Sequence, residues 1–166
     1  LTILQNQGYN LIIITNQSGI ARNFYTERNY HDLTKWMLKD MQEKGINILD
    51  TYYCPHLKQS IDSRYAIDCN CRKPRTGLFM RAINEHYIDL KNSYAIGDQV
   101  RDLQICFKTQ IKGILLSEQD TYEKKEYISI YKKKIFVKSN LLEAAMFIAQ
   151  TNCEGLNYDL ERKSDL

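Results

Sequence analysis

The sequence of 166 residues lacks the features that would place a protein in a membrane or in a repeat class. No apolar run approaches the length of a membrane-spanning helix, and there is no signal-like stretch, internal repeat or low-complexity tract. We therefore expect no membrane partner and a cytoplasmic location. Because a reducing compartment keeps thiols free, we expect the five cysteines to be thiols rather than disulfides.

Length and composition suit a single domain. A chain of 166 residues that is 43% hydrophobic and 26% charged can bury one core but is too short for two ordinary domains. We assign the domain to residues 1–150, treat residues 151–166 as a frayed C-terminal tail, and expect a monomer.

The net charge of +3 is small, and the lysines concentrate late in the chain. A nucleic-acid patch is one interpretation of this segment, but no stacking residues or known binding motif accompany it. A solvated connector is therefore favoured, and we expect no nucleic-acid partner. The lysines concerned are Lys124, Lys125, Lys132, Lys133, Lys134 and Lys138.

Short β-branched runs alternate with amphipathic segments along the chain. Residues 10–15 form a continuous apolar run, which is typical of a strand covered on both faces in a parallel sheet. Similar reasoning predicts strands at 48–53, 93–96, 113–116 and 135–137, and helices at 26–45, 78–87, 100–107 and 141–149. This alternation predicts a doubly wound, Rossmann-like α/β sheet, in which ligands bind beyond the carboxyl ends of the strands.

Four metal-binding side chains lie in one segment after the second strand. Cys54 and His56 are two residues apart, as are Cys69 and Cys71, so each pair can direct both donors to one side of an extended segment. Together they supply the Cys₃His set of a structural Zn²⁺ site. The spacing differs from the Cys-x-x-Cys pairs of zinc ribbons, and a disulfide between Cys54 and Cys69 is an alternative.

Polar residues follow three of the predicted strands. Their hydroxyl and amide donors, cations and carboxylates suit a phosphate group and a hard cation such as Mg²⁺. Each has a structural alternative, because turn residues, a helix N-cap and a surface lysine look the same in isolation. Their joint placement nevertheless predicts a magnesium-dependent phosphate site. The residues are Thr15, Asn16, Gln17 and Ser18 after the first strand, Arg72 and Lys73 in the metal loop, and Asp98 and Gln99 after the third strand.

Three motifs in these positions resemble the haloacid dehalogenase-type phosphatases over about residues 8–116. They are Thr15-Asn16-Gln17-Ser18-Gly19-Ile20-Ala21-Arg22, the metal loop that ends in Arg72-Lys73-Pro74, and Ile96-Gly97-Asp98 with Asp102. Within that superfamily the sequence is most similar to the heptose-bisphosphate phosphatases. A histidinol-phosphate phosphatase, which shares the zinc loop, is the alternative function. The resemblance implies removal of the 7-phosphate of a phosphorylated heptose through an aspartyl-phosphate, in lipopolysaccharide biosynthesis.

The resemblance also implies roles for individual residues. Thr15 would donate a hydrogen bond to the transferring phosphoryl group, aided by Asn16, Gln17 and Ser18. Lys73 would neutralise the growing negative charge, and Arg72 would recognise the substrate. Asp98 would ligate Mg²⁺ with Gln99 near the ion, whereas Zn²⁺ would serve structure alone.

The resemblance stops at the nucleophile. In the superfamily this is the first aspartate of an Asp-x-Asp motif on the opening strand, and the sequence contains no such motif. Residues 1–8 are typical of the end of the helix that follows that strand, so about 30 residues are expected to be absent. The absent strand would be the central one, which would leave its neighbours with unpaired edges.

The chain by itself is therefore expected to be inactive. Two further interpretations remain at this stage. One is a non-catalytic, zinc-stabilised ligand-binding module, which the absent aspartates would explain. The other is a DNA 3′-phosphatase, which the distance of the lysines from the predicted site disfavours.

Overall fold

The computed structural model describes residues 1–118 and 134–151, in which helices and strands alternate. Each predicted strand is present, with ends shifted by no more than one residue. A short helix that the sequence did not predict, α2, follows the first strand. The elements are α1 (Thr2–Asn6), β1 (Leu11–Asn16), α2 (Ser18–Ala21), α3 (Glu27–Glu43), β2 (Ile48–Cys54), α4 (Gly77–His86), β3 (Tyr94–Gly97), the 3₁₀ helix η1 (Val100–Leu103), α5 (Ile105–Lys108), β4 (Lys112–Leu116), β5 (Ile135–Lys138) and a helix over residues 141–151.

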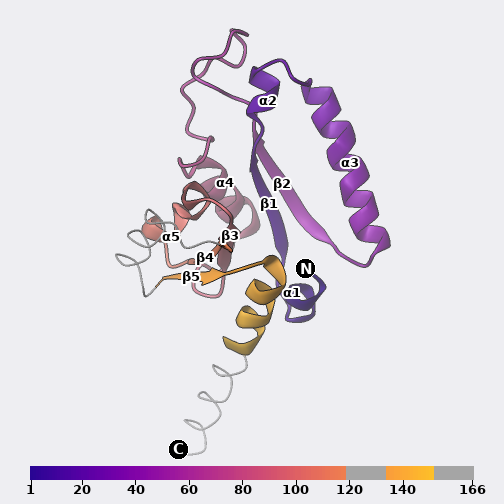
Figure 1. Ribbon diagram of the computed structural model, residues 1–166, viewed down its shortest axis with the longest axis vertical. Helices are drawn as coiled ribbons and strands as arrows, with labels where there is room; N and C mark the ends of the chain where they lie inside the picture. The colour runs from indigo at the N-terminus through magenta and orange to yellow at the C-terminus, as the bar shows by residue number, and fades with distance from the viewer. Residues whose placement is uncertain (119–133, 152–166) are drawn as a thin grey trace, which may run out of the picture.

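The strands form two parallel sheets rather than one continuous sheet. β1 pairs with β2, and β3, β4 and β5 pair in that order (Figure 1). Among the described residues, β1 and β3 each have one edge without a strand partner. The sequence predicts such unpaired edges on the strands that would flank an absent central strand. The described residues form two separate sheets and not one continuous sheet.

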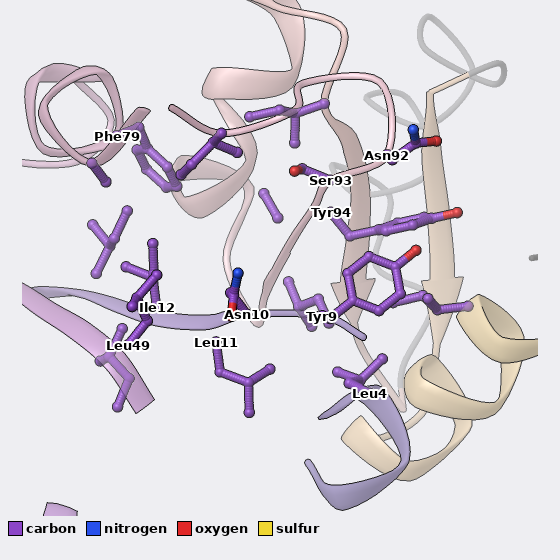
Figure 2. Close-up of a pocket in the computed structure, with 18 of the residues that line it drawn as sticks. Leu4, Tyr9, Asn10, Leu11, Ile12, Leu49, Phe79, Asn92, Ser93 and Tyr94 are labelled. Carbon is purple, nitrogen blue, oxygen red and sulfur yellow. The ribbon is translucent and has the colours of Figure 1, made fainter. Parts of the chain in front are cut away.

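A large pocket lies between these two edges. It has a volume of about 1130 Å³ and is lined by apolar side chains of β1, β3 and α4, including Ile12, Ile96 and Phe79. Figure 2 shows Ile12 and Phe79 facing this space, with Tyr9 and Tyr94 side by side at its other end. Their rings meet edge to face with centroids 6.0 Å apart. The pocket therefore separates the two sheets, and its walls are mainly apolar.

The three-stranded sheet is covered on both faces, as a doubly wound sheet should be. Successive residues of a strand point to opposite faces. Leu115 and Ile135 accordingly pack with η1 and α5, whereas Ile114 packs with α1 and the helix at 141–151. A third cluster joins β2 to α4 through Tyr52 and Leu78. The α/β architecture is thus present even though the sheet is divided.

The helix predicted from Thr26 begins and ends as its sequence indicates. The Thr26 hydroxyl accepts from the Asn29 N–H at 3.1 Å, and the Asn29 side chain accepts from the Thr26 N–H at 2.9 Å. Such a reciprocal cap satisfies N–H groups that have no partner within the helix. Gly45 follows the helix with φ +76°. The predicted apolar face is only partly covered, because Tyr30 is buried but Leu33 is 63% exposed.

The single helix predicted at 100–107 is wrong in detail, because the segment divides into η1 and α5. Asp102 turns its carboxylate back to accept from the Gln99 N–H at 3.1 Å, which closes a tight first turn. Thr26 and Asn29 close the start of α3 in the same way, so this cap is not what divides the segment.

The lysine-rich connector and the predicted tail fall mostly outside the described residues. Of the lysines described, Lys134 donates to the carbonyls of Cys106 and Thr109, at 3.2 and 2.9 Å. It thereby caps α5, which is a structural role. No helix within residues 1–118 or 134–151 is long and apolar enough to cross a membrane.

Candidate active site and metal centre

The predicted phosphate motif and the metal loop start side by side. In the parallel pairing of β1 with β2, Thr15 lies opposite Tyr53 and Asn16 opposite Cys54. The Gln17 N–H then donates to the Cys54 carbonyl at 2.8 Å. The carboxyl end of this sheet therefore brings the first predicted motif next to the first predicted metal ligand.

The structure gathers the four predicted zinc ligands. Their donor atoms all lie within 4.8 Å of one another. Cys54 Sγ is 3.1 Å from Cys71 Sγ and 3.5 Å from Cys69 Sγ, and His56 Nδ1 is 3.2 Å from Cys71 Sγ. A tetrahedral zinc ion with Zn–S bonds of about 2.3 Å needs ligands spaced at roughly this distance. The donor set therefore fits a tetrahedral metal ion.

The disulfide alternative does not hold. All three cysteines of the cluster are free thiols, and a sulfur separation of 3.5 Å between Cys54 and Cys69 exceeds the bond length of about 2.05 Å. The thiols also differ in acidity. Burial raises the pKa of Cys54 and of Cys71. Burial opposes ionisation of Cys69 too, but hydrogen bonds from Cys71 and the Arg72 N–H lower its pKa to about 7.

These pKa shifts predict that metal affinity rises with pH. Cys54 and Cys71 hold their protons at neutral pH in the metal-free protein, and a metal ion binds the thiolate. Each proton released should strengthen the apparent affinity for Zn²⁺ by up to about tenfold per pH unit. Competition with a chromophoric chelator between pH 6 and pH 8 measures this slope. An affinity that is constant over this range would contradict thiolate ligation.

Hydrogen bonds to carbonyl groups tie the metal loop, residues 54–75, to itself and to α2. Arg72 donates to the His56 carbonyl at 3.3 Å, and Arg75 donates to that of Cys69 at 2.5 Å. Ser60 donates to the Ala21 carbonyl at 2.6 Å. Arg72, predicted to recognise substrate, therefore has its guanidinium against the metal loop.

Lys73 lies where the two sheets approach each other. Its ammonium group is 2.7 Å from Asp102 Oδ1 and donates to the Ile14 carbonyl at 2.8 Å. Both charged side chains are nearly buried, at 12% and 10% exposed. The Lys73 main chain is held as well, because its N–H and carbonyl both bond to the Asn16 amide at 3.0 Å. Lys73 thus connects β1 to η1, the turn that follows β3.

The predicted magnesium ligands follow β3. Asp98 is exposed at its end, and Gln99 Nε2 lies 3.4 Å from Asp98 Oδ2. Asp102, one turn later, is the residue to which our sequence reasoning gave no role. The spacing of two aspartates four residues apart was the signal that could have revealed it. The structure brings the carboxylate of Asp102 and the ammonium of Lys73 together, four residues after Asp98 in the chain.

Gly97 makes room for Asp102, and this contact can be tested. A Cβ at Gly97 would overlap the Cβ of Asp102 and lie 2.9 Å from its Oδ2. We expect Gly97→Ala to push Asp102 from Lys73 and to cost about 1–3 kcal/mol, measured by urea unfolding. Gly8→Ala is the control, because Gly8 has φ +83° and a Cβ there meets nothing. Gly8→Ala should cost backbone strain alone. If both variants lower the free energy of unfolding equally, the steric explanation for Gly97→Ala is wrong.

Known phosphatases match most of this chain. The polynucleotide kinase 3 phosphatase family matches residues 1–112. A D-glycero-alpha-D-manno-heptose-1,7-bisphosphate 7-phosphatase of Photorhabdus laumondii is 38% identical over 142 residues, which is 84% of this chain and 77% of the relative. The chain belongs to the haloacid dehalogenase-type phosphatases. This membership agrees with the motifs that carried the resemblance.

Other phosphatases of the family match over a shorter length. The D-glycero-beta-D-manno-heptose-1,7-bisphosphate 7-phosphatase of Haemophilus ducreyi is 44% identical over 114 residues, 68% of this chain and 62% of the relative. A solved structure, D,D-heptose 1,7-bisphosphate phosphatase from B. bronchiseptica complexed with magnesium and phosphate, gives a TM-score of 0.69 at 24% identity. That alignment covers 89% of this chain and 78% of the other. At this identity the structural likeness shows the phosphatase fold.

Proposed function

We propose that this chain is part of a Mg²⁺-dependent phosphomonoesterase that removes the 7-phosphate of D-glycero-D-manno-heptose 1,7-bisphosphate. The observation that carries the proposal is the placement of the Lys73 ammonium between the Ile14 carbonyl of β1 and the carboxylate of Asp102. The names of the relatives support the substrate. A role in lipopolysaccharide heptose synthesis and a cytoplasmic location follow from that substrate.

Phosphoryl transfer requires mainly positioning and neutralisation of charge, which suits these residues. Thr15 at the end of β1 would donate a hydrogen bond to a phosphoryl oxygen, and Lys73 would neutralise the charge that grows there. Asp98 offers a carboxylate ligand for Mg²⁺, which when bound would screen phosphate charge. The Gln99 amide turns its nitrogen towards Asp98 and its oxygen towards the Asp102 N–H, so Gln99 would lie near the ion. Arg72 would meet the sugar part of the substrate at the edge of the metal loop.

The Cys₃His cluster is proposed to hold a structural Zn²⁺. Four donors close the coordination of a tetrahedral ion and leave no position for substrate. Cys54 ends β2, and Cys71 directly precedes Arg72 and Lys73. An ion held by these ligands would therefore fix the main chain of Arg72 and Lys73 relative to the sheet.

We further propose that the pocket between β1 and β3 accepts a strand that carries the carboxylate nucleophile, contributed by chain outside residues 1–166. Its support is the unpaired edge on each side and the apolar lining. Lys73 and Asp102 also line this pocket. A carboxylate at the end of such a strand would lie next to the ammonium of Lys73. Residues 1–150 would then form the domain together with that strand, followed by the tail.

The proposal is tested by phosphate release from the full-length protein with Mg²⁺. We expect heptose 1,7-bisphosphate to be hydrolysed faster than histidinol phosphate or a 3′-phosphorylated oligonucleotide, the last chosen because of the matched family. Residues 1–166 alone should release no phosphate. Preference for histidinol phosphate or the oligonucleotide would replace the proposed substrate, and inactivity of the full-length protein towards all three would favour a non-catalytic module.

A further inference from the structure

Tyr25 lies beside the candidate phosphate site and was absent from every sequence motif that we considered. Its hydroxyl donates to Gln17 Oε1 at 2.5 Å, and Gln17 Nε2 donates to Thr15 Oγ1 at 3.1 Å. Three side chains are thus connected in series, from the surface to the end of β1. The series ends on the residue proposed to contact the phosphoryl group.

The bond lengths indicate the direction of each hydrogen bond. A separation of 2.5 Å suits O–H···O and is short for N–H···O, whereas 3.1 Å suits N–H···O. Tyr25 therefore donates to the oxygen of the Gln17 amide, which leaves the amide nitrogen facing Thr15. With the amide reversed, Gln17 would present an oxygen to Thr15 instead.

This direction decides what Thr15 can do. A threonine hydroxyl has one hydrogen to donate and two lone pairs to accept with. Because Gln17 donates to one lone pair, the Thr15 hydrogen is not used in that bond and can point to another acceptor. A reversed amide would take this hydrogen. A hydroxyl that donates to a phosphoryl oxygen needs the hydrogen free.

The surrounding backbone is shaped to place the Tyr25 ring. Asn23 adopts φ +57°, a left-handed conformation that asparagine tolerates, and the Phe24 N–H returns to the Gly19 carbonyl at 2.9 Å. A Cβ at Gly19 would overlap the Tyr25 ring and lie 2.7 Å from its Oη. The turn and the glycine together let the ring lie over α2 with its hydroxyl on Gln17.

We propose that Tyr25 is a positioning residue of the phosphatase, which acts through Gln17 to keep the Thr15 hydrogen directed at the transferring phosphoryl group. The inference rests on the proposed function. Tyr25 itself does not contact the phosphoryl group. Its contribution should therefore depend on the presence of Thr15.

A double-mutant cycle in the full-length protein tests this dependence. Tyr25→Phe removes the hydroxyl and keeps the ring, and Thr15→Val removes the proposed donor at nearly equal volume. We expect Tyr25→Phe to lower kcat for phosphate release from heptose 1,7-bisphosphate by about 3- to 10-fold with KM within about twofold. In the Thr15→Val background the same change should have no further effect on kcat.

Two variants separate this role from a structural one. Tyr30→Phe alters a buried tyrosine of α3 that also lines the pocket beside Thr15 but bonds to neither Gln17 nor Thr15 in the structure, and it should leave kcat unchanged. Gln17→Leu interrupts the series at its middle, so it should lower kcat at least as much as Tyr25→Phe. It also tests the series if Tyr25→Phe fails to fold.

The proposal is overturned if Tyr25→Phe leaves kcat unchanged, or if its loss persists in full when Thr15 is valine. If the wild-type protein releases no phosphate from any of the substrates, the proposed function fails instead. Titration of inorganic phosphate followed by ³¹P NMR then decides the positioning role. Tyr25→Phe should weaken phosphate binding in the presence of Thr15 and not in its absence, and any other pattern rejects the role.

Discussion

Replacing Cys71 with serine is expected to reduce the zinc content from about one ion per chain to a small fraction of that. Cys71 Sγ lies 3.1 Å from Cys54 Sγ and 3.2 Å from His56 Nδ1, so its loss leaves the site with three of its four donors. Structural zinc contributes roughly 10–16 kcal/mol of apparent binding free energy in small zinc domains, and a zinc ion bound by the cluster would use part of that energy to order residues 54–75. Metal analysis and thermal unfolding with and without chelator measure the effect.

The matched control is Cys106→Ala. Cys106 is fully buried, burial raises its pKa to about 12, and it packs in the core beside Leu103 rather than in the metal cluster. This variant should keep its full zinc content, whatever it loses in core packing. Full zinc in Cys71→Ser, or an unfolding temperature that chelator leaves unchanged, would count against a structural metal.

Replacing Lys73 with methionine in the full-length protein is expected to lower phosphate release by about 100- to 1,000-fold. The ammonium is nearly buried and is the cation held between β1 and η1. Its removal takes away a preorganised charge that no water molecule replaces equally well. Steady-state kinetics should show the loss in kcat.

This variant also leaves Asp102 buried without its partner, which costs about 3–5 kcal/mol in comparable ion pairs. The double variant Lys73→Met with Asp102→Asn removes both charges and should recover much of that stability but none of the activity. Lys58→Met is the control within the metal loop, because Lys58 is 74% exposed and pairs with Asp68 at 3.2 Å. Activity within tenfold of wild type in Lys73→Met would exclude the proposed role.

Features that depend on neighbouring residues were predictable from the sequence. The apolar run before Thr15 predicted a strand, Thr26 predicted a cap, and the paired spacing of Cys54 and Cys71 with their partners predicted the metal cluster. The strand and the cap rest on local periodicity or chemistry within a few residues, and each metal-binding pair rests on a spacing of two residues. The helical conformation of α2 was not predicted, because four residues are too few to show a helical period.

Contacts between distant residues were not predictable in the same way. Asn16 and Lys73 are 57 positions apart. Nothing in either segment indicates that the Asn16 side chain will bond to the main chain of Lys73. The same holds for Lys73 with Asp102. Leu33 fits the helical pattern yet is exposed, because periodicity identifies an apolar face without showing what covers it.

The amide of Asn16 has a consequence for how ligands are received. The Asn16 amide bonds to both the N–H and the carbonyl of Lys73. It thereby satisfies the main chain of this residue in the way that a neighbouring strand does in a β-sheet. The loop that starts at Cys54 is therefore fastened to the same sheet near both of its ends. Conformational freedom is lost when the protein folds rather than when a substrate arrives, so anion binding at Lys73 should show little entropic penalty from loop ordering.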